Sequence, residues 1–94
     1  MKTSIKDKFG PNCINGTKAK NFVVSEILPH LQNGDSVIVD FTGVKRASSS
    51  FVNSIVFNTY GYGLVDNQVS YEADNGIILS MINDAISLLE SEPH

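Results

Sequence analysis

The sequence of 94 residues contains little of the chemistry that marks several protein classes. Cys13 is its only cysteine, so no intrachain disulfide can form, and two histidines without a Cys-x-x-Cys spacing exclude a conventional zinc site. No run of basic residues is longer than Lys45-Arg46, and the formal net charge is -3. Nucleic-acid binding usually requires a basic stripe, and the sequence has none, so we expect no nucleic-acid partner.

Long apolar runs are also missing. Residues 1–8 are polar and mildly basic, and no apolar stretch follows them. We therefore expect no signal peptide, no transmembrane span and no membrane partner, and we expect a cytoplasmic protein. The hydrophobic share of 41% is ordinary for a globular protein, and 94 residues suit one domain, so residues 1–94 are predicted to form a single domain.

Apolar residues recur at three- and four-residue spacing in three segments, which predict helices over residues 17–32, from Ser49 or Ser50 to Gly61, and over residues 76–91. Pro29 should bend the first helix, and Gly61 with Gly63 should end the second. Strands are predicted over residues 2–9, 36–41 and 68–73.

The run Val37-Ile38-Val39 is short and β-branched, which is typical of a central strand covered on both faces. The order of elements alternates strand and helix. It predicts an α/β fold, a small mostly parallel or mixed sheet of three to four strands with helices packed on it, and exposed sheet edges.

One segment is predicted to carry function. Asp40 lies at the carboxyl end of the predicted central strand, and Ser48, Ser49 and Ser50 follow at the start of the next helix. Ligands of open α/β sheets bind beyond the carboxyl ends of strands, and helix N-termini carry free N–H groups and partial positive charge.

The stretch Val39-Asp40-Phe41-x-Gly43-Val44, followed by Ser49-Ser50-Phe51, resembles the bacterial STAS-like domain family of unknown function, which is related to anti-sigma-factor antagonists. Phe9-Gly10-Pro11 and Leu28-Pro29-x-Leu31 extend the resemblance, which covers most of residues 9–60. It implies a STAS-like α/β fold.

The resemblance also implies a function. It implies a regulatory protein-binding module. Because the sequence offers no matched catalytic base, no set of metal ligands and no phosphate loop, we expect that the protein is not an enzyme and needs no cofactor or metal. In anti-sigma-factor antagonists, a partner kinase phosphorylates a serine after this strand. That serine falls on Ser49, with Ser50 beside it, and the implied partner is an anti-sigma-type serine kinase or another signalling protein. Ser48 stands where an aspartate usually precedes, and Phe51 where a glycine usually follows.

The predicted partner-binding surface comprises Asp40, Thr42, Arg46, Ser48 and Phe51. Each of these residues also has a structural interpretation. A serine before a helix usually caps it, an aspartate at a strand end usually accepts backbone N–H groups, and a surface arginine is usually solvated. Two alternative functions stay open: a constitutive interaction or homodimerisation subunit without phosphorylation, and, less favoured, a small anion-binding enzyme that uses the loop near Asp40.

Overall fold

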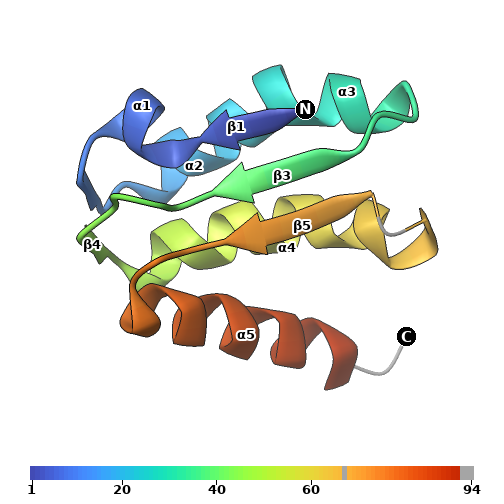
Figure 1. The fold of residues 1–94 in the computed structure, drawn as a ribbon. Helices are drawn as coiled ribbons and strands as arrows, with labels where there is room; N and C mark the ends of the chain where they lie inside the picture. The colour runs from blue at the N-terminus through green and yellow to red at the C-terminus, as the bar shows by residue number, and fades with distance from the viewer. Residues whose placement is uncertain (67, 92–94) are drawn as a thin grey trace.

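The computed structural model describes residues 1–66 and 68–91. In chain order the elements are β1 (Lys2–Ser4), α1 (Ile5–Phe9), β2 (Asn12–Cys13), α2 (Gly16–Phe22), a π-helical segment η1 (Val23–Ile27), α3 (Leu28–Gln32), β3 (Val37–Asp40), β4 (Arg46–Ala47), α4 (Ser49–Asp66), β5 (Val69–Glu72) and α5 (Gly76–Ser91). Figure 1 shows the main strands side by side, with α2 and α4 behind them and α5 at the bottom of the view, where it packs against α4.

The main sheet has three strands in the order β1-β3-β5, and β2 pairs with β4 in a separate two-stranded sheet. Every pairing among the described residues is parallel, which agrees with the mostly parallel alternative and not with a mixed sheet. The reason is connectivity: helices return the chain to the same end of the sheet before each main strand begins, and such crossovers join parallel strands. The small α/β class and the central place of residues 37–40 are confirmed.

Among the residues that the structure describes, helices cover only one face of the main sheet. Val37 and Val39 are fully buried, whereas Ile38 between them is half-buried. The prediction of a strand covered on both faces is therefore wrong. The open face is polar: Lys2 of β1 forms ion pairs with Glu72 (3.1 Å) and with Asp40 (3.8 Å).

The helices bury the apolar stripes that their sequences predict. The fully or almost fully buried apolar residues of α2, η1, α4 and α5 are Ala19, Val23, Ile27, Phe51, Val52, Ile55, Val56, Ile78, Ile82 and Ala85. Aromatic rings join α1 to this core, because the ring of Phe9 lies edge-on to Phe22 (centroids 5.4 Å apart) and to Phe51 (5.0 Å). Burial of these side chains on one sheet face is the main stabilising contribution.

The first predicted strand is shorter than expected. It ends at Ser4, whose hydroxyl accepts the N–H of Asp7 at 3.3 Å and so caps α1. A local hydrogen bond between side chain and backbone starts a helix there. Gly10, at φ +81, then ends the helix, and its N–H donates to the carbonyl of Lys6.

The predicted helix over residues 17–32 is confirmed as one helical run with a distortion before Pro29. The N–H of Leu28 donates to the carbonyl of Val23, five residues back, so the middle of the run is a π-helix. Because Pro29 has no N–H, the carbonyl that it would pair with loses its ordinary donor, and the turn widens ahead of it.

The second predicted helix begins at Ser49 as expected, but it continues to Asp66. Gly61 and Gly63 therefore lie within the helix and do not end it. A glycine inside a helix costs only about 1 kcal/mol relative to alanine, which the burial along the rest of α4 offsets. Among the helices of residues 1–66 and 68–91, none is both long enough and apolar enough to cross a bilayer.

The turn after β3 depends on Gly43, which leads to a first prediction. Gly43 has φ +85, and a Cβ there would lie 2.6 Å from Cδ of Lys6. Gly43→Ala should lower the free energy of unfolding by about 1–2 kcal/mol in urea titrations, because an L side chain is strained at positive φ. Gly76→Ala is the control: a Cβ there meets nothing within 4 Å, so stability should stay within about 0.5 kcal/mol. Equal losses in both variants would contradict this account.

Candidate functional site

The start of α4 is held by the side chain of Ser48. Its Oγ accepts the N–H of Phe51 at 3.1 Å and lies 3.1 Å from the carbonyl oxygen of Ile14, to which it donates. The backbone N–H of Ser48 also donates to the carbonyl of Cys13 at 2.9 Å. Ser48 therefore caps α4 and ties its first turn to the end of β2.

The next two serines are left outside this cap. Ser49 and Ser50 are both exposed on the first turn of α4. The Ser50 hydroxyl lies 3.1 Å from Ser48 Oγ and acts as the donor, because the proton of Ser48 is directed to Ile14. No hydrogen bond of the Ser49 side chain occurs within the described ranges. The predicted placement of the serines on an accessible first helical turn is thus what the structure has.

A groove separates the first turns of α4 and α2. It has a volume of about 600 Å³, and Ser50 and Ser54 line it opposite Thr17 and Lys20. Gly16 allows the start of α2 to lie close to the backbone of α4, because a Cβ at that position would lie only 3.1 Å from the carbonyl oxygen of Ser50. Lys20 makes no ion pair with another described residue, so it contributes an uncompensated positive charge to the groove.

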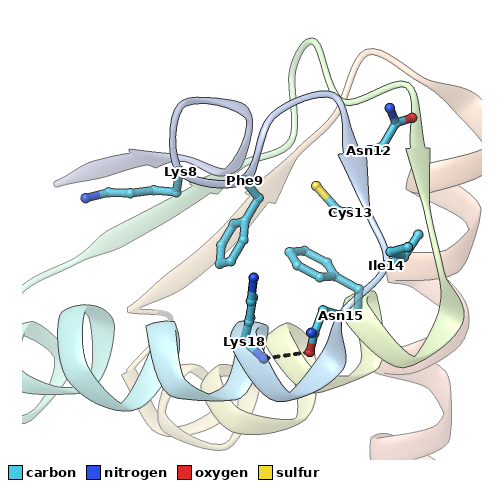
Figure 2. A pocket seen from close by; sticks show the side chains of 8 residues that line it. Lys8, Phe9, Asn12, Cys13, Ile14, Asn15 and Lys18 are labelled. Carbon is cyan, nitrogen blue, oxygen red and sulfur yellow. Dashed lines mark hydrogen bonds between the residues drawn. The ribbon is translucent and has the colours of Figure 1, made fainter.

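A second, smaller pocket lies on the other side of the α2 start, between α1, β2 and α4. It has a volume of about 350 Å³ and is lined by residues that include Phe9, Cys13, Lys18 and Phe51. Figure 2 shows its lining side chains. Cys13 is almost fully buried at its wall, and this burial raises the pKa of the thiol.

Asp40 is engaged in its own loop. One carboxylate oxygen accepts the N–H of Thr42 at 3.0 Å, and the carboxylate lies 3.8 Å from Nζ of Lys2. The hydrogen bond from the Thr42 side chain lowers the pKa of Asp40, helped by the Thr42 N–H and by the charge of Lys2, while partial burial acts in the opposite direction. These contacts match the structural interpretation of Asp40.

Only some of the residues predicted to form the partner-binding surface are exposed to solvent. Thr42 and Arg46 are exposed and Ser48 is half-buried, but Phe51 has 0% of its surface exposed. The prediction that Phe51 belongs to the partner-binding surface is therefore wrong: its side chain lies on the core-facing side of α4, against the ring of Phe9. The loop contacts of Asp40 involve Lys2 and Thr42, whereas the serines contact β2 and α2.

Sequence reasoning missed the residues of α2 that face the serines. Gly16, Thr17 and Lys20 are distant from Ser50 in sequence, and only helix packing brings them together. A local signal does exist in the sequence, because Asn15 is a residue typical of helix caps, and it caps α2 by accepting the N–H of Lys18 at 3.1 Å. Within the described ranges, no group of three or more metal-binding side chains occurs.

Residues 22–64 match the family model described as a STAS-like domain of unknown function (DUF4325). The matched segment runs from the end of α2 through β3 and the three serines into α4. It confirms the resemblance drawn from the residues around Gly43 and Ser49, while Phe9-Gly10-Pro11 lies outside the match. A search of curated proteins found no match, and a search of solved structures found none either.

The cap leads to a second prediction. Ser48→Ala removes the acceptor for the Phe51 N–H and the donor to Ile14, so the free energy of unfolding should fall by about 1–2 kcal/mol in urea titrations. Ser49→Ala is the matched control on the next residue and should change it by less than about 0.5 kcal/mol. If the two variants lose the same stability, Ser48 is not the cap.

The acid side of the stability profile gives a third prediction. Because folding lowers the pKa of Asp40, its contribution is present above the unfolded value of about 3.9 and is lost as pH falls through the lower folded value. Asp40→Asn should therefore flatten the loss of stability between about pH 5 and about pH 3, as measured by denaturant titrations at each pH. Asp84→Asn, at an exposed site on α5, is the control and should not change how steeply the free energy of unfolding falls with pH. If Asp40→Asn also leaves this pH dependence unchanged, the contribution assigned to Asp40 is contradicted.

Proposed function

We propose that this chain is a regulatory protein-binding module switched by phosphorylation of Ser49 or Ser50. One observation supports it most strongly: Ser48 caps the start of α4, and Ser49 and Ser50 beside it are exposed. A kinase can therefore reach either hydroxyl without breaking the helix cap. The match of residues 22–64 to the STAS-like family supports the regulatory class.

Electrostatics explains why such a modification would be tolerated by the fold. A phosphate adds about 1.5 to 2 negative charges at neutral pH. The N-terminus of an 18-residue helix carries partial positive charge, and Lys20 faces Ser50 across the groove without an ion-pair partner among the described residues. The added charge is thus stabilised locally.

The same charge would act differently on a bound partner. Docking over the serines would require the phosphate to lose water, and acidic groups of the partner would be repelled. Phosphorylation would therefore release or exchange the partner while the fold persists. We propose a cytoplasmic partner, an anti-sigma-type serine kinase or another signalling protein, with Thr42 and Arg46 as further exposed contacts.

Constitutive self-association is a second candidate, favoured by a different observation. Among the described residues, β1 and β5 are the edge strands of the main sheet, each paired only with β3, and Ile77 on α5, the helix that follows β5, is 71% exposed. Exposed edges and apolar side chains invite pairing between copies. Light scattering after size exclusion separates the candidates: a stable dimer that Ile77→Glu dissociates, and that Ser49→Asp and Ser50→Asp do not affect, would favour this function.

The switch predicts a dissociation between stability and binding. Ser49→Asp and Ser50→Asp should keep or raise the free energy of unfolding, by up to about 1 kcal/mol, because the carboxylates lie on the first helical turn. In pull-downs from the native host, quantified by mass spectrometry, the same variants should lose partners that the wild type retains. Ser80→Asp, exposed on α5, adds the same charge elsewhere and should retain them.

Modification itself is tested on the protein isolated from its native cells. Peptide mass spectrometry across growth conditions should find phosphate on the peptide with Ser49 and Ser50, and none after phosphatase treatment. Absence of phosphate on both serines under every condition, together with partner binding that the aspartate variants leave unchanged, would overturn the switch.

A further inference from the structure

The pocket between α1, β2 and the first turn of α2 has a chemical character that the proposed switch does not use. We propose that it binds a small organic anion, whose charged group contacts Lys18 and whose apolar body lies against the half-buried ring of Phe9. Its volume of about 350 Å³ lies at the lower end of the range usual for small-molecule sites.

The sign of the pocket's charge follows from its lining. Two lysines and two asparagines line it, and no aspartate or glutamate does. Lys8 is already paired, because its Nζ lies 2.8 Å from a carboxylate oxygen of Glu26. Lys18 forms no ion pair with a described residue. Figure 2 shows the Lys18 side chain directed toward the ring of Phe9, while Lys8 extends away from the pocket. Lys18 is therefore the positive charge that a ligand would meet.

Two amide groups add to the polar side of the pocket. Asn15 uses its oxygen to accept the Lys18 N–H at 3.1 Å, which leaves its NH₂ group available as a donor. Asn12 lies at the exposed rim, and its side chain makes no hydrogen bond with another described residue. One ammonium and two amide donors suit the oxygens of a carboxylate or a phosphate group.

The opposite wall is apolar. Phe9 is half-buried, and its ring is supported from behind by the fully buried ring of Phe51, with the two centroids 5.0 Å apart. The accessible part of the Phe9 ring can accept a flat or branched hydrocarbon body, because their contact removes apolar surface of the ligand and of Phe9 from water. The combination selects an amphipathic anion over a purely inorganic one.

The test uses four probes of known structure: phenylacetate, phenyl phosphate, benzyl alcohol and inorganic phosphate. Each is titrated into the ¹⁵N-labelled chain at fixed pH and ionic strength, and amide shifts are followed by NMR. We expect saturable shifts at Phe9, Cys13 and Lys18 with at least one of the two aromatic anions, in the low-millimolar range usual for ligands of this size. Benzyl alcohol and inorganic phosphate should bind at least about tenfold more weakly.

Variants then locate the charge. Lys18→Gln should weaken binding of the aromatic anion by about tenfold, whereas Lys20→Gln, on the same helical turn but lining the other groove, should change it by less than about twofold. Asn12→Asp, at an exposed position, adds a negative charge at the rim and should abolish binding without unfolding the chain.

Several results would overturn the proposal. These are equal binding of benzyl alcohol and the aromatic anions, equal sensitivity of binding to Lys18→Gln and Lys20→Gln, or no saturable shift around Phe9 with either anion. The relative affinities of phenylacetate and phenyl phosphate tell whether the charged group is a carboxylate or a phosphate. None of these results depends on phosphorylation of Ser49 or Ser50, so the anion site and the phosphorylation switch are tested independently.

Discussion

The burial of Phe51 is the constraint on which both candidate sites depend. Its ring is fully buried against Phe9, and its N–H is held by Ser48. With this one side chain directed inward, the helical geometry of the first turn of α4 directs Ser49 and Ser50 outward. The same ring forms part of the wall of the pocket beside α2. A single packing contact therefore presents the serines and shapes the cavity.

The parallel sheet explains why these features gather at one end of the molecule. Parallel strands have their carboxyl ends at the same edge, so the residues that follow β3 lie near the helix start and the loop that follow β1. The small β2-β4 pair lies at this end as well. Ser48 directly follows β4, and its hydroxyl donates to the carbonyl of Ile14, which directly follows β2. The serine turn is thus joined to the rest of the fold through backbone pairing as well as through the core.

The charges of the chain are separated along its sequence in a way that fits this arrangement. All seven lysines and arginines precede Ser48, whereas six of the ten acidic residues follow it. The positive residues Lys18 and Lys20 consequently lie on α2 beside both candidate sites, and α4 and α5 contribute none. A negatively charged ligand or a phosphate near the start of α4 therefore meets α2 as its source of positive charge.

Local patterns determined the helices and the central strand, because apolar periodicity and caps are properties of neighbouring residues. The sequence alone predicts the helix over residues 76–91, the start of α4 at Ser49 and the strand around Val39. The family resemblance around Gly43 and Ser49 could be read in the same way. The extent of α4 beyond Gly61 could not, because burial elsewhere along the helix outweighed the local cost of glycine.

Tertiary structure alone decided which serine caps, which residues face Ser50, and that Phe51 is buried. The position of Gly16 against Ser50, and of Lys18 beside Phe9, results from the packing of elements that are far apart in sequence. Pairwise packing of this kind depends on the three-dimensional path of the backbone, and no periodicity along a single segment encodes it.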